Sequence, residues 1–476
     1  MVVALKFYVD SHSFLYFIVR AGNGVFAIAT VAVFSRLLSP EEYGFYSVGI
    51  AVATVASAIL FQWLSLAVGR FYPMYYGDTD KVMAAAARAF WCASAVATLI
   101  CVGVLTFYEV LGVGPMLVVI LFLITVALGR HALALQEANA RGALLLYGLI
   151  SWAKGGGSLL AGFIFVNYSL SGQGALLGCL AGLLFAVISF APKPWMTMKL
   201  GNGDTRLSAQ MFRYGLPLTL NTLAIMIVDV ADRFMIGKLL GVAYVAPYAV
   251  AYDIVQQLVG PVMHVLFLAA FPLIVKVFEG EGGEPARIHL LALGNRLVGF
   301  GLPVAVGVGV LASDIAEIIL GSLYRQDATM IMPWLAAAIF LAAFKGYFLD
   351  VVFQLRQQTK YQAYIAIFMA MVNIVLNLLL LPHYGVIAAA WATLAAFTAG
   401  TLASWVVGKS VFLLPALGNV FWKSAFASVM MALALYLLPY LFGIVWLSIK
   451  VILGVITYAT MAWVLDIAGC RKFFKA

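Results

Sequence analysis

Long runs of apolar residues, separated by short polar stretches, extend along a chain of 476 residues. A helix needs about 20 mostly apolar residues to cross the hydrocarbon core of a bilayer. About fourteen runs meet this length; they are about twice as long as the strands of a membrane β-barrel and lack their alternation. We therefore predict an all-α integral membrane protein. The predicted spans are approximately residues 13–34, 44–68, 84–107, 114–136, 145–166, 172–191, 213–236, 244–275, 290–311, 331–353, 361–381, 385–407, 420–440 and 444–466.

The composition agrees with a lipid environment. Apolar residues make up 65% of the chain and charged residues only 10%, whereas a soluble domain carries roughly 25% charged residues. The formal charge is +9, but the basic residues lie in short loops between apolar runs. This distribution indicates membrane orientation and argues against nucleic-acid binding.

The distribution of Lys and Arg predicts which loops face the cytoplasm. If the N-terminus is cytoplasmic, 20 of the 28 Lys and Arg residues fall in cytoplasmic segments and three fall on the opposite side. Such a bias over short loops follows the positive-inside rule. We expect a multi-pass protein of the bacterial inner membrane with both termini in the cytoplasm. Arg20, Asn23 and Gly24 interrupt the first run, which predicts an uncleaved first helix.

The two halves of the chain resemble each other. A shift of 202 residues places Leu37-Leu38 on Leu239-Leu240 and Tyr46 on Tyr248. Each half then contains six helices, which predicts a parallel repeat about an axis along the membrane normal. We expect an N-terminal lobe over residues 1–200, a C-terminal lobe over 201–410 and two accessory helices over 411–476.

Four segments carry a resemblance to a known family. They are Ser35–Tyr46 (SRLLSPEEYGFY) after the first span, Tyr72-Pro73, Tyr214–Pro217 (YGLP) and Tyr384–Ala390 (YGVIAAA). Together with the helix count, they resemble the polysaccharide transporters, the O-antigen-type flippases of the multidrug/oligosaccharidyl-lipid/polysaccharide exporter superfamily. The motifs are structural turns, so they indicate the family rather than the cargo.

The resemblance implies an alternating-access carrier and not an enzyme. Its cargo would be an oligosaccharide on undecaprenyl diphosphate, moved from the cytoplasmic to the outer leaflet for polysaccharide export. The implied partners are this lipid-linked glycan and membrane lipids, with the polysaccharide polymerase and chain-length proteins as further candidates.

Basic residues inside the predicted spans are candidates for binding the cargo. A charge at mid-bilayer costs about 2.5–3.5 kcal/mol on insertion scales, so a functional reason is expected. Arg20 and Asn23 share a helix face, Lys154 precedes Gly155–Gly157, and Lys345 lies near the middle of its span. The glycines permit either a helix break or close packing. We hypothesise a cationic cavity for a diphosphate, with snorkelling or packing as the alternative.

Charged residues, most of them acidic, form a second candidate group, which is either a structural charge cluster or a coupling site. Asp229 and Arg233 are four apart, which favours an intrahelical pair. The spacing of five between Lys345 and Asp350 is unfavourable for a pair within one helix. The whole group is Asp229, Asp232, Arg233, Asp253 and Asp350.

Asn373 and Asn377 are four apart and share a helix face. We expect them to hydrogen-bond a neighbouring helix.

We expect no cofactor and no metal centre, and leave proton or sodium coupling open. The cysteines show no metal-ligand spacing. They are Cys92, Cys101, Cys179 and Cys470.

Other functions are also compatible with such a sequence. A drug or cation exporter of the same superfamily would need acidic pockets, which three mid-membrane basic residues argue against. A flippase for a lipid-linked peptidoglycan precursor has the same helix count. A membrane glycosyltransferase or polymerase could use Glu41-Glu42, but the first outer loop has only about ten residues. No P-loop is present, and an assembly scaffold is a further alternative.

The predicted orientation can be tested by cysteine labelling. In a variant without its natural cysteines, a cysteine at Ser171 or Ser322 should react with an impermeant reagent outside intact spheroplasts. A cysteine at Gly203 should not. Labelling at Gly203 while the inner membrane is intact would reverse the orientation.

Overall fold

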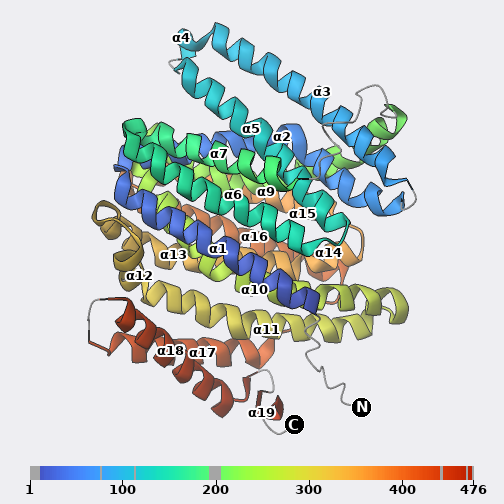
Figure 1. The fold of residues 1–476 in the computed structure, drawn as a ribbon. Coiled ribbons are helices and arrows are strands. Elements are labelled where there is room, and N and C mark those ends of the chain that lie inside the picture. Colours follow the sequence, from blue (N-terminus) through green and yellow to red (C-terminus); the bar gives the residue numbers. More distant parts are fainter. Residues whose placement is uncertain are drawn as a thin grey trace. The chain divides into compact units, whose positions relative to one another are not determined.

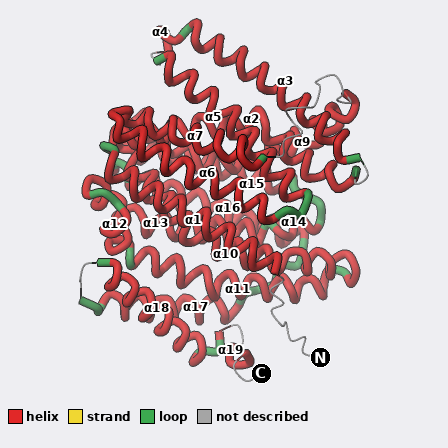
Figure 2. The backbone as a smooth tube through the Cα atoms, viewed as in Figure 1, coloured by secondary structure: helices red, strands yellow, loops and turns green. Residues whose placement is uncertain are grey.

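The structure, a computed structural model, describes residues 11–75, 78–111, 114–191, 205–439, 443–467 and 470–473. Over these residues the chain is almost entirely helical and contains no strand (Figures 1 and 2). This confirms the predicted all-α class. In lipid, a helix is favoured because it satisfies its own backbone N–H and C=O groups, which the bilayer interior cannot do.

Among the residues that the structure describes, thirteen helices are long and apolar enough to cross a membrane. They coincide with thirteen of the fourteen predicted spans. The remaining prediction, residues 213–236, lies within α9 (Thr205–Leu239), a helix of 35 residues that is not among the thirteen. At about 1.5 Å per residue, α9 is nevertheless long enough to span the roughly 30 Å hydrocarbon core.

The chain divides into two compact units. The first comprises Met1–Leu38 and Phe45–Met226, and the second comprises Ser39–Gly44 and Ile227–Ala476. The lobe boundaries expected near residues 200 and 410 stay predictions.

The described part of the first unit contains six long helices and the first part of α9. Helix α6 packs closely against α7 and α1, while α5 packs against α3, α6 and α7. Large side chains such as Phe61, Met83 and Ile124 are buried between these helices. The elements are α1 (Ser11–Leu37), α2 (Pro40–Met74), α3 (Thr79–Thr106), α4 (Tyr108–Leu111), α5 (Pro115–Ala140), α6 (Leu144–Phe165), the π-helix η1 (Val166–Leu170) and α7 (Ser171–Phe190).

The second unit continues from the last part of α9. Helix α10 packs against α11 and α13, and α16 packs against α13 and α15. Its elements are η3 (Val242–Tyr244), α10 (Val245–Glu281), α11 (Gly283–Val310), α12 (Ala312–Ile319), η4 (Ser322–Tyr324), α13 (Arg325–Phe344), the π-helix η5 (Lys345–Leu349), α14 (Val351–Leu355), α15 (Lys360–Tyr384), α16 (Ile387–Val411), α17 (Gly418–Tyr436), α18 (Ile444–Val464) and α19 (Cys470–Phe473).

The helix ends agree with the repeat seen in the sequence. Helix α1 ends at Leu37 and α9 ends at Leu239, which is the predicted shift of 202 residues. A short connection and then a long helix follow in both cases, α2 and α10.

The Ser-Pro-Glu-Glu-Tyr segment after α1 forms a helix cap. The Ser39 backbone N–H donates to Glu42 Oε2 at 2.9 Å, and the Glu42 N–H donates to Ser39 Oγ at 3.3 Å. This reciprocal pair is a capping box. The next residue, Tyr43, is buried and packs edge-to-face on Tyr324, with ring centroids 5.7 Å apart. The motif therefore serves local structure, as expected from the sequence.

The accessory helices α17 and α18 pack on α11 and α12. Lys450 of α18 is buried, and its Nζ donates to Asp314 Oδ1 at 2.7 Å and Oδ2 at 3.0 Å. This pair compensates a basic residue near the start of an apolar helix.

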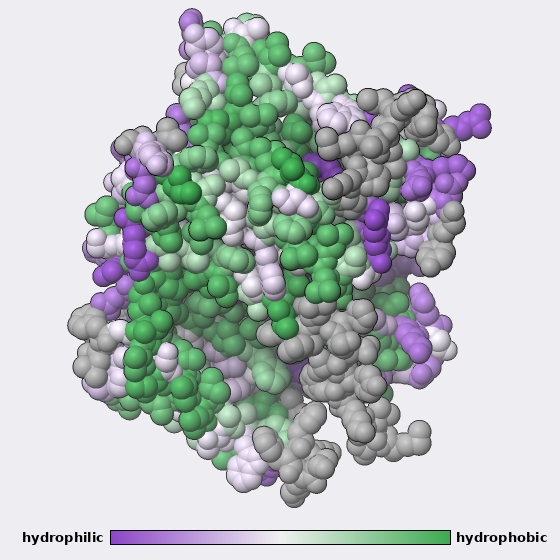
Figure 3. Space-filling view, viewed as in Figure 1, coloured by the Kyte–Doolittle hydropathy of each residue, from purple (hydrophilic) through white to green (hydrophobic). Residues whose placement is uncertain are grey.

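The outer surface is apolar over most of the helices' length. Figure 3 shows a face that is largely hydrophobic, with hydrophilic side chains gathered toward its left and right margins. Exposed side chains such as Leu99, Leu160 and Ile188 lie within candidate membrane spans. This pattern matches a protein whose solvent is lipid around its middle and water at its ends.

Candidate functional site

The first unit places two of the predicted cations on adjacent helices. Arg20 and Asn23 lie on α1 and Lys154 lies on α6, all half-buried. The two helices are in direct contact, because Trp152 Nε1 donates to the Val19 carbonyl at 3.1 Å. Lys154 sits near the midpoint of α6 and forms no ion pair within the part of the chain that the structure describes.

The glycines after Lys154 act in packing. Helix α6 is continuous from Leu144 to Phe165, so the alternative of a helix break is excluded. A Cβ on Gly155 would lie 2.9 Å from Phe26 Cβ on α1, and one on Gly157 would lie 3.1 Å from Gly182 Cα on α7. Small residues therefore let α1 and α7 approach the helix that carries Lys154.

His131 of α5 is a neighbour of Lys154 that the sequence did not reveal. Its side chain is buried, lies within electrostatic range of Lys154, and makes a hydrogen bond to the backbone of Ile150. Its Nε2 atom has no hydrogen-bond partner among the described residues. Sequence spacing could not indicate this proximity, because the two residues lie on different helices.

Lys345 and Asp350 form a buried ion pair, which corrects the expectation that their spacing is unfavourable. Lys345 Nζ donates to Asp350 Oδ2 at 2.7 Å, and each residue is only 7% exposed. The reason is the π-helix η5, in which the Asp350 N–H donates to the Lys345 carbonyl at 2.9 Å. A turn closed by an i to i+5 bond aligns residues five apart, and such bulges are frequent at functional sites.

Two further groups hold Asp350 in place. Ser404 Oγ of α16 donates to Asp350 Oδ1 at 2.8 Å, and Gln362 Nε2 of α15 donates to the Asp350 carbonyl at 2.9 Å. The Lys345 ammonium is therefore compensated in this conformation. An anionic ligand would have to compete with Asp350 for it, whereas no such competitor faces Lys154 among the described residues.

Arg233 is paired with a residue on the neighbouring helix. Its Nη2 lies 2.6 Å from Asp253 Oδ1 of α10. The predicted partner, Asp229, has a side chain outside those that the structure describes, so that pairing stays a prediction. The sequence spacing could not indicate Asp253, which is 20 residues away.

Asp232 lies at the centre of a buried polar network. Its Oδ1 accepts from Asn373 Nδ2 at 3.0 Å and Asn377 Nδ2 at 2.7 Å. Its Oδ2 accepts from Thr393 Oγ1 at 2.5 Å and from the Tyr248 hydroxyl. The prediction that the two asparagines bond a neighbouring helix is confirmed, since Asp232 is on α9 and they are on α15.

The network supplies Asp232 with neutral partners only. Asp232 is 1% exposed, and none of its hydrogen-bond partners within the described part of the chain is a cation. An uncompensated buried carboxylate costs several kcal/mol even after relaxation. Two states remove that cost, a protonated carboxyl or a cation held by the surrounding oxygens. The Asn377 Oδ1 atom is buried without a hydrogen-bond partner and is a further available acceptor.

The fold is that of a membrane transporter of the multidrug/oligosaccharidyl-lipid/polysaccharide exporter (MOP) type. It is similar to the lipid II flippase MurJ in an inward closed conformation, with a TM-score of 0.74 and 14% identity over 95% of this chain and 98% of that one. A multidrug resistance MATE transporter of the MOP superfamily, inward-facing, matches with a TM-score of 0.56 and 14% identity over 84% of this chain and 95% of that one. A MOP superfamily transporter from Pyrococcus furiosus matches with a TM-score of 0.55 and 14% identity over 84% of this chain and 94% of that one.

Within that class, the sequence defines the family. The family model described as "Polysaccharide biosynthesis protein" matches residues 33–329. This is more than half of the chain, and the chain belongs to that family. Among curated proteins, no sequence matches this chain. The matched range covers parts of both units but not the accessory helices.

The Lys345–Asp350 pair predicts a specific pattern of stability. Lys345→Met should leave Asp350 buried and unpaired, which typically costs about 3–5 kcal/mol. The double variant Lys345→Met with Asp350→Asn should recover most of the lost thermal stability, because the amide still accepts from Ser404. The measurement is the unfolding temperature in detergent, with Lys276→Met, an exposed lysine of α10, as the control. A Lys345→Met protein that unfolds no earlier than the wild type would contradict the buried pair.

Proposed function

We propose that the protein is a flippase that moves a lipid-diphosphate-linked oligosaccharide from the cytoplasmic to the outer leaflet by alternating access, for polysaccharide export. The family and the transporter fold support this proposal. The observation that carries it is Lys154, a half-buried cation at the middle of α6 with no ion pair in the described residues. A cation in that position favours an anionic ligand over a cationic drug.

A diphosphate suits this site because it offers a dense negative charge. Charge-assisted hydrogen bonds from an ammonium to phosphate oxygens are roughly twice as strong as neutral ones. Arg20 and Asn23 on the adjacent α1 supply a second cation and an amide within the same unit. Lys345 would take part only in a conformation in which its bond to Asp350 opens. The oligosaccharide and the lipid tail extend from opposite ends of the diphosphate, and the tail stays in the bilayer.

We further propose that the Asp232 network couples transport to an ion. A carboxyl with four neutral donors can alternate between a protonated and a charged state, or hold a sodium ion with the oxygens of Thr393, Asn373 and Asn377. Either ion would compensate the buried charge, so its release would bias the second unit toward another conformation. Arg233–Asp253 is too well compensated for this role. No cofactor is required by the proposal.

The proposed cargo differs from those named for the similar solved structures. MurJ is described as a lipid II flippase and the MATE transporters as multidrug resistance proteins. A lipid-linked peptidoglycan precursor also carries a diphosphate, so Lys154 fits it equally, and the family membership favours the polysaccharide cargo. We place the protein in the bacterial inner membrane with both termini cytoplasmic, where polysaccharide polymerase and chain-length proteins would be its neighbours. A glycosyltransferase or polymerase is the enzymatic alternative.

Substitutions of Lys154 test the cationic site. Lys154→Ala and Lys154→Gln should lower surface glycan at least tenfold, since a lost charge-assisted contact is worth about 1.5–3 kcal/mol. Lys154→Arg should keep part of the activity, because the charge survives while the geometry changes. Surface glycan is measured by gel and protein level by blot, with Lys276→Gln as the matched control. Normal glycan from a well-expressed Lys154→Ala would show that this lysine does not bind the cargo.

Asp232→Asn tests the coupling proposal. The substitution keeps the size of the side chain and an acceptor for its neighbours but removes the charge. The purified protein should unfold at the wild-type temperature or above it. In proteoliposomes, wild-type transport should respond to an imposed sodium gradient or pH gradient, each applied alone, and the variant should respond to neither. A variant that follows the gradient as the wild type does would leave the network with a structural role only.

A further inference from the structure

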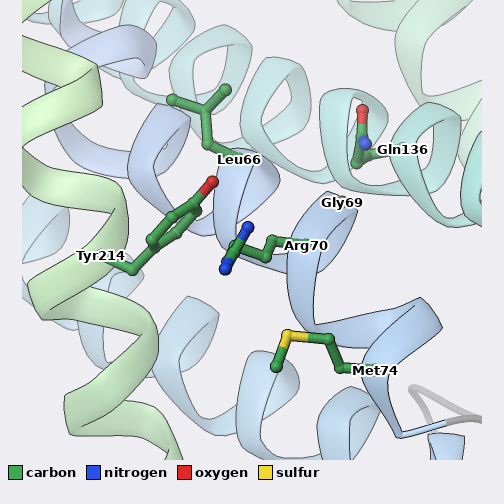
Figure 4. Close-up of a pocket in the computed structure, with 6 residues that line it drawn as sticks. All are labelled: Leu66, Gly69, Arg70, Met74, Gln136 and Tyr214. Carbon is green, nitrogen blue, oxygen red and sulfur yellow. The ribbon is translucent and has the colours of Figure 1, made fainter. Parts of the chain in front are cut away.

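A cavity of about 560 Å³ opens in the first unit, and neither Arg20 nor Lys154 lines it. It lies between the last turns of α2, the last turns of α5 and the beginning of α9. Figure 4 shows the Arg70 guanidinium beside the Tyr214 ring, with Leu66 and Met74 on either side and Gln136 across the opening. The volume is in the usual range for small-molecule sites, roughly 300–1,000 Å³.

Arg70 gives this cavity an uncompensated positive charge. Its guanidinium lies 5.2 Å from the centroid of the Tyr214 ring, and Tyr214 is itself held edge-to-face by Phe71, with centroids 5.9 Å apart. Arg70 forms no ion pair within the described residues. The nearby Arg141 differs, because it lies over Tyr72 and pairs with Glu137. Both arginines lie over tyrosine rings near the end of α2, but only Arg70 lines the cavity.

The other residues that line the cavity form a polar side and an apolar side. Gln136 reaches the cavity because residue 69 is glycine, since a Cβ there would lie 2.3 Å from Gln136 Nε2. The Gln136 amide and the Tyr214 hydroxyl are hydrogen-bond donors, and the planar guanidinium can bind two phosphate oxygens at once. Leu66 and Met74 form an apolar side that suits a hydrocarbon chain. The lining therefore fits an amphiphile with an anionic head.

We propose that this cavity binds the phosphate head group of a lipid at the membrane surface, separately from Lys154. The predicted orientation places this end of α2 at the cytoplasmic side, where lipid-linked sugars would be loaded, and that part of the argument rests on the proposed function. The head group belongs either to a polyprenyl diphosphate or to a bulk anionic phospholipid. Both offer phosphate oxygens to Arg70 and a chain to Leu66 and Met74.

Ligand binding to the full-length protein in phosphatidylcholine nanodiscs tests the proposal. The probes are a fluorescent short-chain prenyl diphosphate, with unlabelled phosphatidylglycerol and inorganic pyrophosphate as competitors. Arg70→Gln should weaken prenyl diphosphate binding about tenfold. The matched control is Arg213→Gln, an exposed arginine of α9 beside Tyr214 that does not line the cavity, and it should bind as the wild type does. Gly69→Ala, which displaces the Gln136 amide, provides a second test that leaves Arg70 in place.

Competition identifies the source of the head group. Displacement by phosphatidylglycerol at similar concentrations would assign a general anionic-lipid site, and no displacement would assign the polyprenyl diphosphate. Displacement by pyrophosphate as effective as by the lipids would overturn the lipid site. Equal binding by the wild type and both cavity variants, or an equal loss in Arg213→Gln, would also overturn it. Because binding is measured without transport, a protein that binds through Arg70 but flips no glycan would refute the proposed function and leave this site intact.

Discussion

The bilayer interior offers neither hydrogen-bond partners nor a high dielectric constant, and this constraint governs the whole structure. The backbone is helical over almost all of the described residues, because helices satisfy their own polar groups. Side-chain charges follow the same constraint, since each must be paired, neutralised or exposed to water. Lys345–Asp350, Arg233–Asp253 and Lys450–Asp314 meet it by direct pairing, with N–O distances of 2.7, 2.6 and 2.7 Å.

Two groups meet the constraint differently, and they are the basis of the functional proposals. Lys154 of the first unit is half-buried without an acidic partner among the described residues, and Asp232 of the second unit is buried among neutral donors. An anion would compensate the charge of Lys154, and a proton or a cation would compensate that of Asp232. A transporter that carries a diphosphate and uses an ion to reset itself needs both kinds of site. Paired charges cannot serve as readily, because a ligand must first displace the partner.

The sequence predicted the fold well because membrane spans depend on local composition. Thirteen of the fourteen predicted spans coincide with candidate spans, and Asn373 and Asn377 bond another helix as expected. The failures concern non-local or irregular geometry. The Lys345–Asp350 pair depends on a π-helix, which residue propensities in the sequence do not predict. Asp253 and His131 contact residues on other helices. Arg70 and Tyr214 are 144 residues apart in the chain, so their spacing could not indicate that they are neighbours.

If the protein acts as we propose, it recognises its cargo through the diphosphate. The direct measurement uses proteoliposomes that contain the purified protein and one of two glycolipids with the same oligosaccharide and polyprenyl chain. One glycolipid is linked through a diphosphate and the other through an uncharged bond. Lectin added outside reports how fast the sugar from the inner leaflet appears at the surface. We expect protein-dependent appearance of the diphosphate-linked glycan and only the protein-free rate for the neutral one. Equal protein-dependent rates for both would contradict it.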